Sequence, residues 1–223
     1  MFTPTVYYCY DAYCGWCYGF SPVMRQFWQR HQHQLAFEVL SGGMILPEKP
    51  VHISPTAPYI LSAYQQVEAL AGVQFGADYL WHLQNPELTD WYPHSLKPAI
   101  ALSIIKQQQP HQAVPFAAQL QQALFAEGRD LTDDEAYRHL LPRYQVDVDY
   151  FMQALHSPQM EEAARYDFAL CKQLQVQGYP TVLLQVADTK FYLMAHGYTP
   201  LQDLEKRLAH ILQEIGAAAD PAE

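Results

Sequence analysis

The chain has 223 residues, of which half are hydrophobic, 13% are aromatic and only 16% are charged. This composition excludes an intrinsically disordered chain, which has few apolar residues and many charges. The formal net charge of -10 repels phosphate backbones and anionic lipid surfaces. The longest apolar stretch, residues 99–105, is far shorter than the roughly 20 residues that cross a bilayer. We therefore expect no nucleic-acid partner and no membrane partner.

The first residues, Met1 to Pro4, carry neither the basic segment nor the apolar core of a secretory signal. We therefore expect a cytoplasmic protein. Structural disulfides are rare in that reducing compartment. The four cysteines are then chemically active, metal-binding or simply buried, and they are Cys9, Cys14, Cys17 and Cys171.

The first 50 residues have the pattern of a β-α-β unit. The β-branched and aromatic run Thr5–Tyr10 predicts a buried strand, and Leu35–Leu40 predicts a second one that ends in a turn at residues 41–43. Between them, apolar residues recur at helical spacing and predict an amphipathic helix from Cys14, with a kink at Pro22. This apolar stripe consists of Phe20, Val23, Met24, Phe27, Trp28 and His31.

Residues 51–177 are predicted to be helical almost throughout, as several short helices. Asp147 and Ser157 are typical helix N-caps, and Pro158 suits the first position of a helix. Thr132 and Glu135 have the spacing of a capping box. Groups of glutamines are expected on solvated helix faces, among them Gln119, Gln121 and Gln122.

The last part of the chain predicts a hairpin and a helix. Thr181–Val186 and Phe191–Ala195 are apolar runs with a turn between them at Ala187 and Asp188. Thr199 and Pro200 suit the start of a final helix, which we expect to stop at Gly216.

Taken together, these elements predict an α/β fold in which one sheet is divided along the chain by an insertion. The order is β-α-β, then a large helical block, then β-β-α. We expect residues 1–50 and 178–223 to form one domain and residues 51–177 to form an inserted, all-helical domain.

Cys14 and Cys17 form a C-x-x-C motif directly after a strand and at the start of a helix. Unpaired backbone N–H groups and the helix dipole favour an anion at that place, so Cys14 is the expected nucleophile. Cys17 follows three residues later on the same helical face and is the expected resolving thiol. Gly15 would let a substrate backbone approach, while Tyr13 and Trp16 would offer apolar surface beside the sulfur or serve only in packing.

Three other interpretations of the cysteines are less favoured. A zinc site lacks two further ligands near the C-x-x-C pair. The spacing of Cys9, Cys14, Cys17 and Cys171 matches that of plant-type [2Fe-2S] ligands, but Cys9 falls in a predicted strand and Cys171 in a predicted helix. Inert burial is the plain interpretation of Cys9 and Cys171, and a poor one for the pair at the helix start.

Two further features lie near the predicted strand ends. Tyr179 and Pro180 directly precede an apolar strand, a position where proline is tolerated. Asp11 follows the first strand. It could shift the pKa of the Cys17 thiol, but an acidic residue at a strand end is more often a solvated turn residue. The ten histidines form no recognisable ligand motif.

The sequence Asp11-x-x-Cys14-Gly15-Trp16-Cys17, the helical insertion and Gly178-Tyr179-Pro180-Thr181 resemble the DsbA-like branch of the thioredoxin-fold oxidoreductases. The resemblance is greatest to the cytoplasmic FrnE-type subgroup of dithiol-disulfide isomerases. It implies a thioredoxin fold in which Pro180 is cis and faces the two cysteines, and in which Tyr179 pairs with substrate backbone. Many subgroup members have proline where this chain has Gly15, and the residues between the cysteines tune redox poise, so the direction of the reaction stays open.

The resulting hypothesis is a thiol-disulfide oxidoreductase or isomerase that acts on protein thiols and disulfides. It needs no cofactor beyond the Cys14–Cys17 pair, with glutathione as a candidate electron partner. One alternative is a glutathione-dependent transferase or isomerase of a small hydrophobic molecule, although the fold relatives with that chemistry use serine in place of Cys14. Another alternative is a peptide-binding or holdase module without redox turnover.

Overall fold

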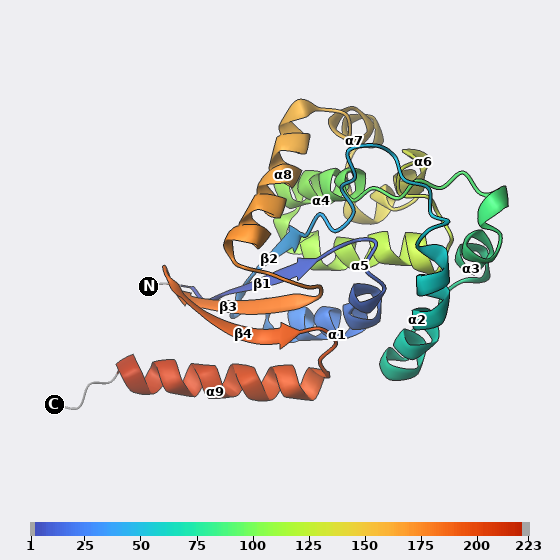
Figure 1. Cartoon of the computed structure of the whole chain (residues 1–223). Coiled ribbons are helices and arrows are strands. Elements are labelled where there is room, and N and C mark those ends of the chain that lie inside the picture. The colour runs from blue at the N-terminus through green and yellow to red at the C-terminus, as the bar shows by residue number, and fades with distance from the viewer. Residues whose placement is uncertain (1–2, 220–223) are drawn as a thin grey trace.

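The computed structural model describes residues 3–219, and its centre is one four-stranded sheet (Figure 1). The first half of the sheet comes from the N-terminal β-α-β unit. The second half comes from the C-terminal β-β-α unit, so the predicted division of one sheet by an insertion is confirmed. These elements are β1 (Thr5–Tyr10), α1 (Gly15–His31), β2 (Ala36–Ser41), β3 (Thr181–Ala187), β4 (Lys190–His196) and α9 (Leu201–Ala219).

The strand order is β2-β1-β3-β4, which places β1 in the middle of the sheet. β1 runs parallel to β2, with Tyr10 beside Ser41, and antiparallel to β3, with Cys9 beside Thr181. The ends of β1 and β2 and the start of β3 therefore meet at one edge of the sheet. That edge holds the residues of the candidate site.

Helices fill the chain between β2 and β3. Figure 1 shows α8 and α9 on opposite sides of the sheet, and α1 packs against both α9 and α5. Asp147 and Ser157 are N-caps as predicted, because their side chains accept the N–H groups of Tyr150 and Met160. The helices are α2 (Ala57–Ala71), α3 (Ala77–Gln84), α4 (Leu96–Gln108), α5 (Ala113–Phe125), α6 (Glu135–Arg138), α7 (Val148–Ala154) and α8 (Pro158–Gln173).

Two predicted helix ends are wrong. α6 begins at Glu135 with Asp134 at the N-cap, so Thr132 and Glu135 form no capping box. The aspartates of this turn accept the local N–H groups instead: Asp130 accepts that of Thr132 (2.8 Å) and Asp133 that of Glu135 (3.0 Å). At the other end of the chain, α9 continues through Gly216 to Ala219.

α1 runs without interruption through Pro22. Proline has no N–H group, so the carbonyl of Tyr18 loses its normal helical donor. The hydroxyl of Ser21 donates to that carbonyl at 3.0 Å. A neighbouring side chain thus satisfies the acceptor that the proline leaves open.

A buried ion pair joins the helical insertion to the sheet. Lys106 on α4 donates to both carboxylate oxygens of Asp167 on α8, at 2.9 and 3.1 Å, and to the carbonyl of Val39 on β2 at 2.9 Å. It also pairs with Glu38. Asp167 in turn accepts the N–H of Ser41 at 3.3 Å. One ammonium group therefore connects α4, α8 and β2.

Within residues 3–219, none of the helices combines the length and the apolar character that a membrane crossing would need.

Candidate active site

Cys14 occupies the N-cap of α1. Its backbone is extended (φ -85°, ψ 110°), and its sulfur accepts the N–H of Cys17 at 3.4 Å. The Cys14 N–H donates to the carbonyl of Asp11 at 3.1 Å, which closes the turn between β1 and α1. The motif therefore lies where a strand-to-helix turn points the Cys14 sulfur at the start of α1, where backbone N–H groups lack helical partners.

Cys14 and Cys17 differ in exposure. The side chain of Cys14 is 7% exposed and that of Cys17 is fully buried. Burial, and then the hydrogen bond with Cys14, raise the pKa of the Cys17 thiol well above its usual value. The arrangement keeps Cys17 protonated behind Cys14, which is the sulfur nearer to solvent.

Tyr179 and Pro180 lie directly against the cysteine motif. The peptide bond between them is cis, and the thiol of Cys14 donates to the carbonyl oxygen of Tyr179 at 3.5 Å. The phenol of Tyr179 reaches across to donate to the carbonyl of Gly42 at 2.9 Å. This fold therefore brings together two segments that are 165 residues apart in the chain.

Tyr13, Gly15 and Trp16 are half-buried, so each presents part of its surface to solvent around Cys14. Tyr13 and Trp16 also pack against the main core with the rest of their surface. A Cβ atom on Gly15 would lie 3.6 Å from the ring of Phe75, an ordinary contact. The turn therefore has room for a side chain at this position.

Asp11 is buried, at 1% exposure, which corrects the expectation of a solvated turn residue. One carboxylate oxygen accepts the N–H of Tyr13 and the hydroxyl of Ser95, each at 3.0 Å. The other accepts the N–H of Met44 at 2.7 Å. Burial raises the pKa of Asp11, and these hydrogen bonds oppose that shift. Asp11 thus links the cysteine turn to the segment after β2 and to the start of α4.

Gln121 on α5 is fully buried beside the motif, so the prediction of a solvated face is wrong at this position. In the amide orientation that gives both side-chain atoms a partner, the Gln121 nitrogen donates to the carbonyl of Cys17 (3.2 Å). The Gln121 oxygen then accepts the N–H of Tyr18 (3.0 Å). The sequence holds one signal for this burial, because Gln121 lies among the apolar residues of α5 that face α1.

The four cysteines form two separate pairs. Cys14 and Cys17 belong to the main core, whereas Cys9 and Cys171 pack together with Leu40 in a second, small cluster. Four ligands of a [2Fe-2S] cluster would have to surround one centre. This arrangement does not fit that interpretation of the spacing.

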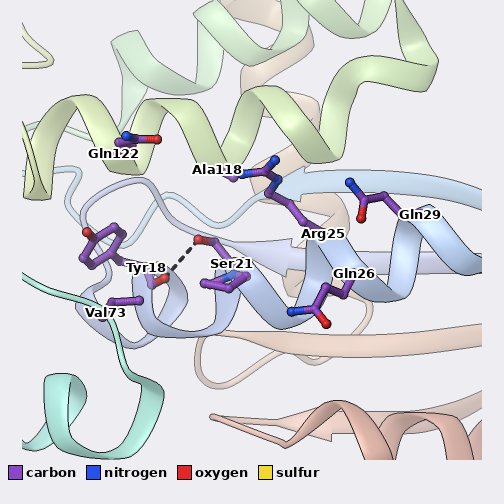
Figure 2. A pocket seen from close by; sticks show the side chains of 9 residues that line it. Tyr18, Ser21, Arg25, Gln26, Gln29, Val73, Ala118 and Gln122 are labelled. Atoms are coloured by element: carbon purple, nitrogen blue, oxygen red, sulfur yellow. Dashed lines mark hydrogen bonds between the residues drawn. The ribbon is translucent and has the colours of Figure 1, made fainter.

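A cavity of about 330 Å³ lies on the flank of α1, beyond the cysteine motif (Figure 2). Figure 2 shows Arg25, Gln26 and Gln29 along one helix beside this cavity, with Gln122 across from them. Neither Cys14 nor Cys17 lines it. A second cavity of about 500 Å³ lies next to the motif, between the segment after β2 and the end of α8. Its lining includes Gly42, Gly43, Leu46, Phe168, Lys172 and Tyr179.

The fold is that of a thioredoxin-fold protein with a C-x-x-C motif at the start of α1, and the comparison with known proteins gives its family. The model of the DSBA-like thioredoxin domain family matches residues 5–209, and the chain belongs to that family. The inferred DsbA-like relationship and the thioredoxin fold are thereby confirmed.

Two solved structures are similar over nearly their whole length. One, from Nitrosomonas europaea, is proposed to be a protein disulfide isomerase. It superposes with a TM-score of 0.80 at 21% sequence identity, and the match covers 96% of this chain and 99% of that one. The other is the cytosolic disulfide reductase DsbM from Pseudomonas aeruginosa. It superposes with a TM-score of 0.75 at 24% sequence identity, and the match covers 94% of this chain and 98% of that one. At these identities the likeness shows the fold alone.

A curated relative is the ClpXP adapter protein SpxH of Shouchella clausii, 20% identical over 176 residues, which are 79% of this chain and 56% of the relative. The chain therefore spans about half the length of the curated relatives that it matches.

Proposed function

We propose that the protein is a thiol-disulfide oxidoreductase or isomerase that exchanges disulfides with protein substrates through Cys14 and Cys17. The observation that carries this proposal is the position of the Cys14 sulfur. It sits at the N-cap of α1, 3.4 Å from the N–H of Cys17 and 3.5 Å from the carbonyl oxygen of Tyr179. Disulfide exchange needs a nucleophilic thiol and a second thiol that resolves the mixed disulfide. The Tyr179 carbonyl beside the Cys14 sulfur would also accept a backbone N–H of a peptide substrate.

The Cys14 thiolate attacks one sulfur of a substrate disulfide, and the other substrate sulfur leaves as a thiolate and takes a proton. Cys17 then loses its proton and attacks the Cys14 sulfur of the mixed disulfide, which releases the second substrate thiol. The protein dithiol is oxidised to a disulfide and the substrate disulfide is reduced to two thiols. The reverse sequence oxidises a substrate dithiol.

The order of attack follows from burial. Only Cys14 retains exposed surface, and the raised pKa of Cys17 keeps that thiol protonated until the mixed disulfide has formed. The carbonyl of Tyr179, at the cis bond to Pro180, would accept an N–H of the substrate backbone in place of the Cys14 thiol. Tyr13, Gly15 and Trp16 would form the surface on which the substrate lies.

Glutathione is the proposed electron partner, and the cytoplasm is the proposed compartment. In support, a structure of DsbM, described as a cytosolic disulfide reductase, was solved with GSH. Its likeness to this chain has a TM-score of 0.72 at 20% identity over 94% of this chain and 99% of that one. A glutathione pool would re-reduce a Cys14–Cys17 disulfide after each turnover.

A binding module without redox turnover is the second candidate function, favoured by the likeness to ClpXP adapter proteins. Under that hypothesis Tyr13 and Trp16 would bind a peptide, and binding would survive loss of both thiols. A transferase acting on a small molecule has less support, because the cavity on the flank of α1 is not lined by Cys14.

The deciding experiment compares single variants in an assay of disulfide reduction on a protein substrate. Cys17→Ser is expected to accumulate mixed disulfides that disappear with dithiothreitol, because the resolving thiol is missing. Cys14→Ser is expected to lose exchange, while Cys171→Ser, a matched control in another cluster, retains it. Retained turnover in Cys14→Ser would exclude the proposal, and peptide binding that survives in Cys14→Ser/Cys17→Ser would favour the binding module.

A further inference from the structure

A second pair of cysteines lies on the other face of the sheet. Tyr8 and Tyr10 on β1 belong to the core that contains Cys17, and side chains alternate between faces along a strand. Cys9 therefore points away from Cys17 and packs against Cys171 of α8. β1 separates this pair from the Cys14–Cys17 motif.

Both thiols of the second pair are buried, Cys9 at 0% and Cys171 at 1% exposure. The Cys171 thiol donates to the carbonyl of Ser41 at 3.6 Å. Interaction with Cys9, and then burial, raise the pKa of the Cys171 thiol well above its usual value, so Cys171 keeps its proton. Cys9 and Cys171 therefore pack together as buried thiols in one small cluster.

The cluster lies next to open space. Val176 and Tyr179 pack against it, and both also line the cavity of about 500 Å³ beside the cysteine motif. Leu40, a member of the cluster, and Leu170, which packs on it, line a further cavity of about 670 Å³ on the same side of the sheet. A small oxidant in either cavity would be one layer of side chains from the sulfurs.

We propose that Cys9 and Cys171 are a second redox pair, which closes to an intramolecular disulfide when hydrogen peroxide is the oxidant. In the first step Cys9 is oxidised to a sulfenic acid, and the peroxide O–O bond breaks with release of one water. In the second step the Cys171 sulfur attacks the sulfur of Cys9, and the sulfenic hydroxyl leaves with the Cys171 proton as a second water. Two thiols are oxidised to one disulfide, and one peroxide is reduced to two waters.

The disulfide would join α8 covalently to β1. α8 is the last helix of the insertion, and β1 is the central strand that leads to Cys14. Tyr179, whose carbonyl accepts the Cys14 thiol, packs against this cluster as well as against the main core. Oxidation of Cys9 and Cys171 would therefore take place next to a residue that contacts the candidate active site. The proposal does not depend on disulfide exchange at Cys14.

The test uses Cys14→Ser/Cys17→Ser, in which Cys9 and Cys171 are the remaining thiols. The folded protein is treated with hydrogen peroxide, denatured, alkylated with N-ethylmaleimide and weighed by mass spectrometry. We expect a monomer that has lost two hydrogens and takes up no alkyl group, and that takes up two after dithiothreitol. Cys14→Ser/Cys17→Ser/Cys171→Ser is the matched control and is expected to form no intramolecular disulfide.

A parallel digest of oxidised wild-type protein keeps the test decisive if the double variant folds poorly. We expect a peptide that joins the segments containing Cys9 and Cys171. The inference is overturned if both thiols are still alkylated at a peroxide dose that fully oxidises Cys14 and Cys17 in wild-type protein. Sulfinic acid at either cysteine, or a disulfide only between two chains, would overturn it as well.

Discussion

The thiol of Cys14 donates to the carbonyl oxygen of Tyr179 across 3.5 Å, which joins the start of α1 to the segment that enters β3. This contact depends on three strand ends that meet at one edge of the sheet. It also depends on Gly42, whose carbonyl accepts the phenol of Tyr179 at 2.9 Å. The candidate site is thus built by long-range packing around a short local motif.

Gly42 is predicted to be essential for this arrangement. A Cβ atom there would lie 2.2 Å from the ring of Tyr179, so Gly42→Ala must displace the ring from its bond to the position 42 carbonyl. We expect a loss of about 1–3 kcal/mol in the free energy of unfolding, measured with urea, together with slower disulfide exchange. The control is Gly216→Ala, which meets nothing within 4 Å and lies in a helix, so alanine should be neutral or stabilising. Equal stability and rate for Gly42→Ala and wild type would contradict the account.

Asp11 is predicted to hold the cysteine turn in place. In Asp11→Asn an amide nitrogen would replace one of two oxygens that both accept hydrogen bonds, so a buried N–H of Tyr13 or Met44 would face another donor. We expect a loss of about 1–3 kcal/mol in unfolding free energy. Ser95→Ala removes one hydrogen bond to the same carboxylate and the acceptor of the Ile45 N–H, and its cost should be about 1–3 kcal/mol. An Asp11→Asn variant as stable as wild type would show that the carboxylate does not anchor this turn.

The ion pair between Lys106 and Asp167 is predicted to contribute strongly to the free energy of unfolding, in a way that depends on both partners. Lys106→Met leaves the buried Asp167 carboxylate without its cation, so we expect a loss of about 3 kcal/mol or more in unfolding free energy. Lys106→Met/Asp167→Leu should recover part of that loss, because no buried charge is left unpaired. Glu38, the other carboxylate that pairs with Lys106, is partly exposed to solvent. A matched surface pair is Arg165–Glu161, where Arg165→Ala should cost less than about 0.5 kcal/mol. If the double variant is less stable than Lys106→Met, the ion pair itself is not the source of the effect.

Stability is predicted to fall at alkaline pH. Burial raises the pKa of Tyr8 and Tyr10 well above 10.0, and that of Cys17 well above 9.0. Above those unfolded values the unfolded chain releases protons that the folded chain keeps, so unfolding becomes more favourable as pH rises. Each group contributes about 1.4 kcal/mol per pH unit until its folded pKa is reached.

Tyr8→Phe tests this pH dependence directly. The Tyr8 hydroxyl has no hydrogen-bond partner among the described residues, so phenylalanine loses no hydrogen bond there. Above pH 10 the variant should lose stability less steeply than wild type, by about 1.4 kcal/mol per pH unit. Parallel curves of unfolding free energy against pH would contradict the burial of a protonated Tyr8.

Local sequence patterns predicted the elements that carry the motif. Thr5–Tyr10 is a strand because it is apolar and β-branched, and Cys14 caps a helix because the apolar stripe of α1 starts directly after it. The resemblance to a known family, rather than any periodicity, indicated that Tyr179 and Pro180 face Cys14. Spacing alone could not show that contact, since its partners lie at distant points of the chain.

Burial of polar side chains could not be predicted from local patterns. Asp11 and Gln121 are types usually found in water, and each is buried only because partners from other elements satisfy it. The contact between Cys9 and Cys171 has the same origin, because a strand and a distant helix have to pack before the two sulfurs meet. The fold supplies these long-range contacts.

The most direct test of the central claim is the redox equilibrium of Cys14 and Cys17. Cys171→Ser protein, which cannot form the second disulfide, is equilibrated in glutathione buffers of graded ratio, and free thiols are counted by mass after alkylation. We expect a Cys14–Cys17 disulfide that forms with a defined midpoint potential. A potential near about -270 mV would indicate a reductase, and one between about -180 and -120 mV an isomerase or oxidant. If both thiols stay free at every glutathione ratio, disulfide exchange at this site is contradicted.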